Sequence, residues 1–324
     1  MTPRAQVGSL VVLESSGTRS MRNLFRKAPA YVTVPGQARP AADDAPADGM
    51  WVRCDNERCR ELLYAREFEH NLKVCHKCQH HARLSARERI AQIVDQGSFI
   101  ERDAELAPTD PLDFDALGAS YRQKLAEAAS KSGESEAAVA GSACLDGQPI
   151  QLAVLDFGFM GASMGSVVGE KIARAAERAS DGGAALVTVS ASGGARMQEG
   201  IFSLMQMAKT VTALATLADA AVPHISVLAD PTLGGVTASY AGVGDVIVVE
   251  DGALVGFAGP RVIEQITKQK LPADAQHAAF LLEHGMVDLV VQRRELRPTL
   301  VKLVRLFAAA TQGLRARPPV AVEV

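Results

Sequence analysis

Two adjacent glycines, Gly193 and Gly194, stand between a hydrophobic strand expected at 184–190 and an amphipathic helix expected at 197–219. Glycine permits backbone conformations that a Cβ forbids, and it lets a ligand come close to the main-chain amides. The helix expected after the turn adds the partial positive charge of its N-terminus. This junction predicts an oxyanion hole, in which N–H groups hold negative charge that develops during a reaction. A phosphate loop is disfavoured, because neither the P-loop spacing nor a GxGxxG pattern is found.

Three further glycine-rich segments follow expected strands: Phe157–Ser166, Asp230–Val236 and Gly256–Arg261. The small residues around Gly161 would let a thioester-bearing arm pass close to the backbone. Gly234 and Gly235 repeat the order of strand, paired glycines and helix start, and Pro260 places Arg261 at the beginning of another helix. Each segment alone is also typical of a tight turn, but four of them in one chain favour a binding site.

Side chains offer little obvious reactivity. The sequence contains no GxSxG elbow, no HExxH motif and no convincing His–acid partner for a serine. Cys144 stands alone, which favours a small buried hydrophobe over a nucleophile. Arg196 and Arg261 are candidates to pair with a substrate carboxylate, with an ion pair at the edge of the core as the equal alternative. We therefore expect chemistry that depends mainly on amide donors.

Four cysteines form two pairs, Cys54-x4-Cys59 and Cys75-x2-Cys78. Four thiolates at such spacing predict a closed, tetrahedral structural Zn²⁺ site in a small ribbon that folds around the metal. The insert between the pairs is predicted to form a short hairpin. An alternative stays open in which a neighbouring histidine replaces one cysteine: His76, His80 or His81.

Strands and helices alternate through most of the chain, which predicts an α/β fold with mostly buried sheets. The 324 residues, 48% hydrophobic and 22% charged, suit one large core with a small satellite domain. A helical pattern begins at Ala82 and is followed by a loop-rich region around Pro108 and Pro111. Strands are expected at 149–157, 184–190, 224–229, 246–249, 253–257 and 287–291, and helices at 165–180, 197–219, 233–241, 260–269, 275–284 and 295–310.

The predicted domain organisation has four parts: a flexible arm and linker over 1–50, a zinc ribbon over 51–82, the α/β domain over 83–311 and a flexible tail over 312–324. The sequence contains no run of about 18 apolar residues, so no membrane span is predicted. Paired cysteines suited to a metal indicate a reducing compartment, so a cytoplasmic location is expected.

The motifs together resemble those of the carboxyltransferase beta subunits of bacterial acetyl-CoA carboxylases, over about 21–310. The most specific are the four-cysteine ribbon with His80-His81-Ala82-Arg83, and the runs Phe157–Val168, Ser190–Glu199, Leu204–Thr210, Asp230–Val236 and Gly256–Gln265. The gap between Cys54 and Cys59 departs from this pattern, because the family usually has two residues there.

This resemblance implies a crotonase-like (ClpP/crotonase) spiral of ββα turns with an N-terminal four-Cys zinc ribbon. It also implies transfer of a carboxyl group from carboxybiotin, on a separate biotin carboxyl carrier protein, to acetyl-CoA, giving malonyl-CoA for fatty acid synthesis. Gly193 and Gly194 would form one oxyanion hole, and Gly161, Gly234 and Gly235 would line the pocket. A second hole would lie on an alpha subunit, in an alpha2beta2 assembly that works with biotin carboxylase.

Two alternatives remain at this stage. Another biotin-dependent acyl-CoA carboxylase or decarboxylase would use the same glycines, although the small Ala162 and Ser163 favour a short acyl group. A nucleic-acid-binding function would rest on residues 51–90, where nine Lys and Arg face six Asp and Glu. Scattered aromatic residues favour only weak binding of that kind. The ribbon is better interpreted as covering the active-site entrance or helping to dock coenzyme A.

Overall fold

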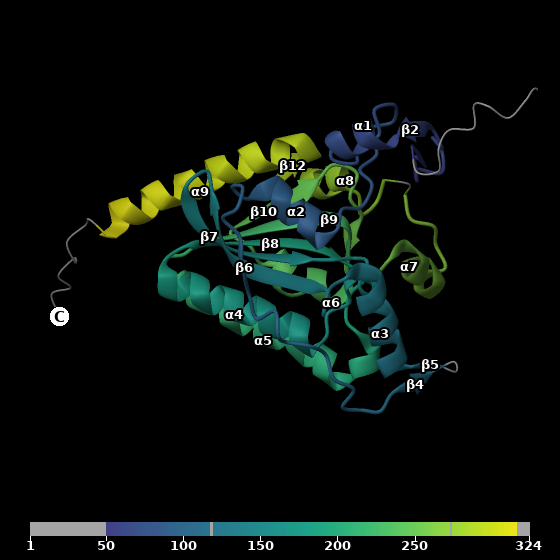
Figure 1. The fold of residues 1–324 in the computed structure, drawn as a ribbon, viewed down its shortest axis with the longest axis horizontal. Coiled ribbons are helices and arrows are strands. Elements are labelled where there is room, and N and C mark those ends of the chain that lie inside the picture. Colours follow the sequence, from purple (N-terminus) through teal and green to yellow (C-terminus); the bar gives the residue numbers. More distant parts are fainter. Residues whose placement is uncertain (1–49, 117–118, 273, 316–324) are drawn as a thin grey trace, which may run out of the picture. The chain divides into compact units, whose positions relative to one another are not determined.

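The computed structural model describes residues 50–116, 119–272 and 274–315, so most of the predicted arm and tail lie outside the described residues. Among these residues an eight-stranded sheet has the order β12-β10-β9-β8-β7-β6-β3, with β11 paired to β9 (Figure 1). Strands β7 to β10 and β12 run parallel, whereas β6 is antiparallel to both β3 and β7. The strands are β3 (Ile100–Arg102), β6 (Ala138–Leu145), β7 (Gln148–Leu155), β8 (Ala185–Ser192), β9 (His224–Leu233), β10 (Val246–Glu250), β11 (Val255–Gly256) and β12 (Leu289–Val291).

Helices cover both faces of this sheet. Side chains alternate along β7, so that Ala153 and Leu155 join the core beneath α4 (Ser166–Gly182) and α5 (Ile201–Asp219). Leu152 and Val154 join the opposite core, beneath α2 (Ala86–Ile93) and α9 (Arg293–Arg315). The remaining helices are α1 (Ala65–His70), α3 (Tyr121–Ser132), α6 (Gly234–Thr237), α7 (Pro260–Thr267) and α8 (Ala278–Glu283), with 3₁₀ turns η2 (Met160–Ala162), η3 (Met197–Glu199) and η4 (Tyr240–Gly242). Burial of both faces explains why these strands read as continuous hydrophobic runs.

All six strands and most helices lie where the sequence predicts them, and α9 continues four residues into the predicted tail. The elements that the sequence did not predict include β3, β6 and α3. The expected helix at 197–219 is also interrupted. Gly200, with φ 54° and ψ −126°, separates the turn η3 from α5, which begins only at Ile201. The paired glycines at 193–194 therefore do not adjoin a helix N-terminus, and the predicted contribution of a helix dipole there is wrong.

The ribbon is built from β1 (Trp51–Arg53), antiparallel to β2 (Leu62–Tyr64), followed by α1. The hairpin thus encloses the first cysteine pair, and part of the insert that was expected to form it is helical instead. Arg293 of α9 attaches the ribbon to the domain by donating to the carbonyls of Leu72 and Ala82, at 2.8 and 2.7 Å. The ribbon is therefore held by hydrogen bonds to the α/β domain. The short pair β4 (Asp115–Ala116) and β5 (Ala119–Ser120) precedes α3.

Helix α5 carries an unusually apolar outer face. By length and composition alone it would pass for a membrane-crossing helix, although 33% of that stretch is buried against the domain. Its exposed side chains include Leu204 and Met205, at 53% and 56% exposure. An apolar face this long on α5 is typical of a surface that contacts another protein.

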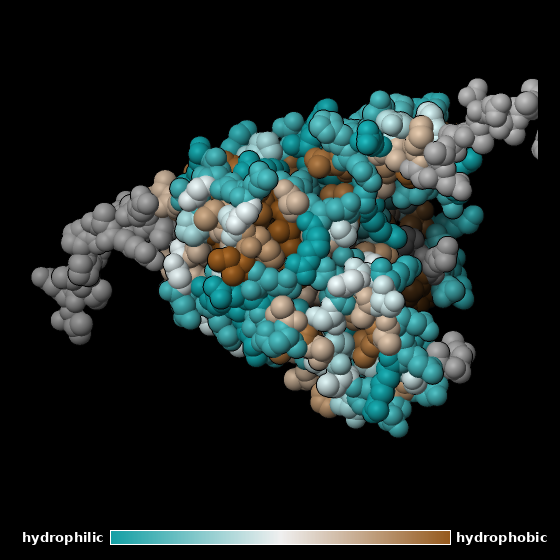
Figure 2. All heavy atoms as spheres, in the orientation of Figure 1, coloured by the Kyte–Doolittle hydropathy of each residue, from teal (hydrophilic) through white to brown (hydrophobic). Residues whose placement is uncertain are grey.

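On the face drawn in Figure 2, hydrophilic side chains predominate, and hydrophobic ones gather between α4 and α9, over β6 and β7.

Candidate active site

The glycine-rich segments meet at one place beyond the ends of β7, β8 and β9. We call residues 157–165, 192–196, 233–235 and 256–259 the loop cluster. The Gly193 N–H donates to the Gly161 carbonyl at 2.9 Å, and the Met164 N–H donates to the Gly194 carbonyl at 2.7 Å. A Cβ added to Gly194 would lie 3.2 Å from the Gly234 Cα, and one added to Gly234 would lie 3.8 Å from the Phe257 carbonyl oxygen. The four segments, whose number in one chain favours a binding site, thus lie together.

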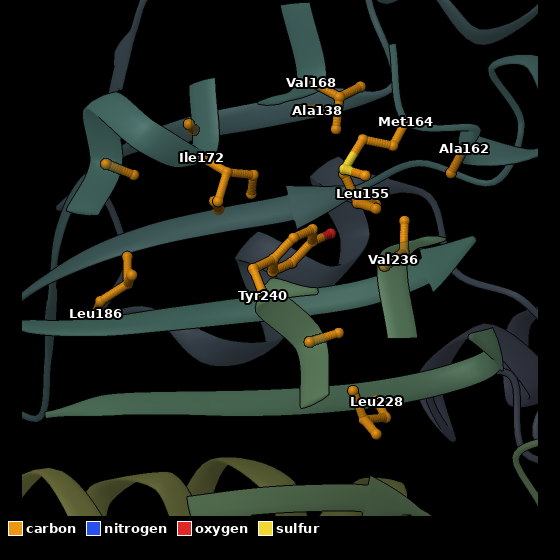
Figure 3. Close-up of a cluster of buried hydrophobic side chains, with 14 of the residues drawn as sticks. Ala138, Leu155, Ala162, Met164, Val168, Ile172, Leu186, Leu228, Val236 and Tyr240 are labelled. Carbon is orange, nitrogen blue, oxygen red and sulfur yellow. The ribbon is translucent and has the colours of Figure 1, made fainter. Parts of the chain in front are cut away.

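The first segment contains a left-handed turn. Met160, Gly161 and Ala162 have φ angles of 48°, 64° and 47° in succession. Left-handed backbone is unfavourable for residues with a Cβ, and such strain gathers at functional sites. Ala162 is fixed by the Ser192 hydroxyl, which donates to its carbonyl at 2.6 Å. Figure 3 shows Ala162 and Met164 within a buried cluster that also contains Leu155 and Val236, so the core holds the turn in place.

The paired glycines do not supply free donors in this structure. The Gly193 N–H is used by the Gly161 carbonyl, and the Gly194 N–H donates to the Ser192 hydroxyl at 3.0 Å. Gly194 adopts φ 115° and touches the backbone at Gly234, so its lack of a Cβ serves close packing. These bonds argue against the prediction that the Gly193 and Gly194 amides form the oxyanion hole. Among the described residues, several N–H groups of the cluster's first two segments make no hydrogen bond, including those of Gly161 and Ala195.

Arg196 is fully buried and held within the protein. Its guanidinium makes two bonds to the Glu136 carboxylate, at 2.5 and 2.7 Å, and donates to the Ser163 carbonyl at 2.7 Å. Burial lowers the pKa of Arg196, but the bonds to Glu136 outweigh that effect and raise it. The sequence left two alternatives open for Arg196, a bond to a substrate carboxylate and an internal ion pair. Because its donors are engaged inside the chain, the internal ion pair, which fixes the turn, is favoured.

A second carboxylate completes this buried network. Glu199 accepts from the Tyr121 hydroxyl at 2.7 Å and from the Ser166 N–H at 2.6 Å, and also from the Ser166 hydroxyl. Burial raises the pKa of Tyr121, so it stays a neutral donor. The network joins α3, the start of α4 and the turn that carries Arg196. Sequence reasoning missed Glu136 and Tyr121 because both precede the recognisable motifs and no local signal marks them.

The other predicted pocket residues lie at element starts. Gly234 and Gly235 begin α6, where first-turn amides lack intrahelical acceptors. Arg261 lies in the first turn of α7 after Pro260, as predicted, but its side chain is outside the described part of the chain. The segment before it is held by the Gln276 side-chain amide, which donates to the Ala258 carbonyl at 2.8 Å.

The loop cluster borders a large cavity. Met160 and Gly161 form part of the wall of a hollow of about 720 Å³ that continues past Phe157 towards α3 and the ribbon. This volume is in the range of small-molecule sites. The left-handed turn therefore lies at the edge of a space large enough for a substrate.

The four ribbon cysteines form a single cluster. Their sulfur atoms all lie within 4.8 Å of one another, with Cys54 and Cys78 at 3.7 Å and Cys59 and Cys75 at 4.0 Å. A tetrahedral zinc site with Zn–S bonds of about 2.3 Å places its sulfurs about 3.8 Å apart, so the residues fit a structural zinc ion. The four-residue gap does not prevent the ligands from converging. No histidine belongs to this cluster among the described residues.

A buried ion-pair network lies where the ribbon meets the domain. Glu250 accepts from Arg89 at 2.5 Å and from Arg293 at 3.1 Å. Burial alone would raise the pKa of Glu250, but the two guanidinium groups outweigh it and lower the pKa to about 2. On the ribbon itself, Lys73 pairs with Glu88 and Lys77 with Glu61, each at 2.5 Å. These pairs reduce the charge that the ribbon presents to a nucleic acid.

Family models match both parts of the chain. An acetyl-CoA carboxylase zinc finger domain matches residues 51–78, and a carboxyl transferase domain matches residues 78–323. The chain belongs to the carboxyl transferase family. The acetyl-coenzyme A carboxylase carboxyl transferase subunit beta of Chloroflexus aurantiacus (strain ATCC 29366 / DSM 635 / J-10-fl) is 55% identical over 260 residues, covering 80% of this chain and 84% of the relative. The subunit beta 2 of Roseiflexus castenholzii (strain DSM 13941 / HLO8) is 51% identical over 289 residues, covering 89% and 94%.

Solved carboxyl transferase structures share the fold. Transcarboxylase 12S with methylmalonyl-coenzyme A and methylmalonic acid bound is 28% identical, with a TM-score of 0.58 over 68% of this chain and 41% of that chain. A Pseudomonas malonate decarboxylase hetero-tetramer in complex with malonate is 26% identical, with a TM-score of 0.57 over 73% and 92%. The predicted crotonase-like fold with a four-Cys ribbon is confirmed, and this carboxyl transferase is a beta-type subunit of a carboxyl transfer enzyme.

Proposed function

We propose that this chain transfers a carboxyl group to acetyl-CoA, giving malonyl-CoA, in an active site that it shares with a homologous alpha subunit. The beta-subunit names of its relatives and its acetyl-CoA carboxylase zinc ribbon support this assignment. The observation that carries the proposal is the left-handed turn at Gly161, whose N–H faces no acceptor near the turn at the edge of the cavity. The turn offers a fixed donor where a thioester oxygen can lie.

The reaction places negative charge on two oxygen atoms. The carboxyl group arrives on a biotin borne by a separate carrier protein. Cleavage of the N–C bond to biotin releases the carboxyl group as CO2 and leaves negative charge on the biotin ureido group, which takes up the proton from the acetyl methyl group. Loss of this proton turns the thioester into an enolate with charge on its oxygen, and the enolate carbon then forms the new bond to the carboxyl carbon. Preorganised N–H donors at the enolate oxygen lower the barrier because they bind it more strongly than the ground-state carbonyl.

We assign the enolate donors to the N–H groups of Gly161 and Ala195. The peptide that carries the Gly161 N–H is held at the Met160 carbonyl, which accepts from the Ser163 N–H at 3.3 Å. The peptide that carries the Ala195 N–H is held at the Gly194 carbonyl, which accepts from the Met164 N–H at 2.7 Å. Gly194 thus helps to position the Ala195 donor. The second charged oxygen lies on the biotin, and its donors would come from the alpha subunit. This chain would therefore contain only half of the active site.

The outer face of α5 supports contact with another subunit. Ile201, Phe202, Leu204 and Met205 are 60%, 44%, 53% and 56% exposed, just after the loop cluster ends. We assign this face to the alpha subunit of an alpha2beta2 assembly. Met205→Glu should abolish co-purification with the alpha subunit, whereas Leu306→Glu, an equally exposed apolar position on α9, should not. Equal retention in both variants would contradict this assignment.

We also propose a structural zinc ion and a cytoplasmic location for the protein. We assign one structural Zn²⁺ to Cys54, Cys59, Cys75 and Cys78, whose thiolates would persist in a reducing, cytoplasmic compartment. A biotin carboxylase would recharge the biotin carrier after each transfer.

The test is co-expression with the alpha subunit of an acetyl-CoA carboxylase, followed by a carboxyl transfer assay. Malonyl-CoA formation by the pair, and none by the isolated chain, is the expected result. Propionyl-CoA serves as the rival substrate. A clear preference for propionyl-CoA would replace acetyl-CoA with a longer acyl group, and an inactive pair would contradict carboxyl transfer to either.

A further inference from the structure

The segment that leaves the ribbon ends at Arg83, whose side chain lies against the loop cluster. The central carbon of its guanidinium lies 4.0 Å from the centre of the Phe157 ring, an arrangement in which the cation is attracted to the aromatic face. A Cβ added to Gly161 would lie 3.8 Å from Cζ of the same ring. Phe157 therefore connects Arg83 to the left-handed turn.

The same guanidinium also reaches β9. It lies 3.8 Å from the carboxylate of Asp230, shortly before Leu233, where the third segment of the loop cluster begins. The other carboxylate oxygen accepts from the Leu254 N–H at 3.1 Å, and the Thr232 N–H donates to the Leu254 carbonyl at 2.9 Å. Asp230 is therefore fixed to the backbone that continues into the third segment. Arg83 thus bridges the first and third segments of the loop cluster.

The backbone that carries Arg83 is fixed from the opposite side by α9. Arg293 donates at 2.7 Å to the Ala82 carbonyl, which belongs to the peptide that joins Ala82 to Arg83. The Ala82 N–H donates to the Lys73 carbonyl at 3.0 Å. Arg293 is 2% exposed and is held in turn by Glu250 at 3.1 Å. The side chain of Arg83 therefore extends towards the loops from an immobilised peptide.

A narrow space marks the point where these groups meet. Its volume is about 10 Å³, and Arg83, Phe157, Asp230 and Arg293 all border it. The exit of the ribbon, two loops and α9 thus converge there. The space has room for about one water molecule and is too small for a substrate. Contacts made at this point therefore hold the loops together rather than bind a ligand.

We propose that Arg83 is a positioning residue for carboxyl transfer, which holds the Phe157 and Asp230 loops together and thereby fixes the Gly161 N–H. This role rests on the proposed function, because Gly161 is a donor assigned there. A preorganised donor stabilises developing charge only when it lies about 3 Å from the charged oxygen, so a displaced loop lowers the rate. The side chains of Arg83 and Asp230 are 53% and 35% exposed, so the bridge contributes little to folding.

Hydrogen exchange measures the position of the loops directly. In the zinc-loaded full chain, Arg83→Gln should make the amides of 157–165 and 230–235 exchange about three- to tenfold faster, as expected for the loss of one cation–π contact and one exposed ion pair. Exchange of the α5 amides should stay unchanged. Arg66→Gln is the matched control, because Arg66 is an exposed arginine of α1 with no ion pair among the described residues. Unchanged exchange in both loops of Arg83→Gln would overturn the bridge.

Kinetics of the complex with the alpha subunit separate positioning from substrate contact. Arg83→Gln should lower kcat for acetyl-CoA about three- to tenfold and change the KM by less than about twofold. A raised KM with unchanged kcat would overturn the positioning role and make Arg83 a substrate contact. Faster exchange of the loops, with no malonyl-CoA from the unaltered complex, would retain the bridge and contradict the proposed function.

A double variant tests whether Arg83 acts through Asp230. Asp230→Asn removes the charge but keeps an oxygen for the Leu254 N–H, so it should cause part of the kcat loss seen in Arg83→Gln. The double variant should lose no more than Arg83→Gln alone, because its second substitution removes a contact that is already absent. Multiplied losses in the double variant would contradict a bridge between these two residues.

Discussion

Glu136→Gln tests whether Arg196 is a structural residue of the turn. The substitution removes the charge that faces the guanidinium but keeps the shape of the side chain. Both groups are completely buried, and their two bonds measure 2.5 and 2.7 Å. Breaking a buried ion pair by removing one partner costs about 3–5 kcal/mol, because the other charge stays buried without compensation.

The structure places the expected cost at the lower end of that range. Arg196 would keep its bonds to Ser163 and remain 3.4 Å from Glu199, which partly compensates its charge. We therefore expect the free energy of unfolding to fall by about 3 kcal/mol. With a urea dependence of about 3 kcal/mol per M, the unfolding midpoint should fall by about 1 M.

Urea unfolding followed by far-UV circular dichroism measures this shift in the zinc-loaded chain. Glu177→Gln is the matched control, because Glu177 is exposed on α4 and has no ion pair among the described residues. Its effect should stay within about 0.5 kcal/mol. An unfolding midpoint of Glu136→Gln that coincides with that of the control would refute the structural role and favour the other alternative that the sequence left open, binding of a substrate carboxylate by Arg196.

Three further predictions concern the metal, the paired glycines and acid stability. Cys75→Ser should reduce bound zinc, measured by elemental analysis, from about one ion per chain to near zero, whereas Cys144→Ser should keep it; zinc retained in the first variant would exclude the four-Cys site. Gly194→Ala adds a Cβ 3.2 Å from the Gly234 Cα at a residue with φ 115°, so the free energy of unfolding in urea should fall by about 3 kcal/mol. For Gly147→Ala, where the added Cβ meets open space, it should fall by about 1–2 kcal/mol. Equal losses would contradict the packing role of Gly194. Burial lowers the pKa of His224 to about 4, so the folded protein holds this side chain in its neutral form. The stability that depends on it is complete above pH 6.5, and about 3 kcal/mol of the free energy of unfolding is lost as the pH falls from 6.5 to 4. Identical dependence of unfolding free energy on pH in the unaltered chain and in His224→Gln would contradict this.

The sequence predicts six of the eight strands of the sheet, β7 to β12, because their side chains enter two cores and leave hydrophobic runs. It does not predict α3, whose only buried side chains are Tyr121 and Ala128 and whose apolar pattern is correspondingly weak. The loop cluster is predictable as a set of glycine-rich turns, but its hydrogen bonds are not. The bond from Gly193 to Gly161 joins residues 32 positions apart, and no local pattern determines which amides such contacts consume. The left-handed angles of Met160 and Ala162 oppose their residue types, so only tertiary contacts account for them.

The side chains of the main glycine motif act inwards. Ser192 holds the left-handed turn, Arg196 reaches Glu136, and Glu199 reaches Tyr121 and the start of α4. Each is buried and bonded within the chain, so none of these side chains is free to meet a substrate. A donor fixed in this way costs no reorganisation when charge develops beside it, whereas a flexible side chain would have to be ordered first. Under the proposed function, the buried charges would serve catalysis indirectly, by making the backbone around Gly161 and Ala195 rigid.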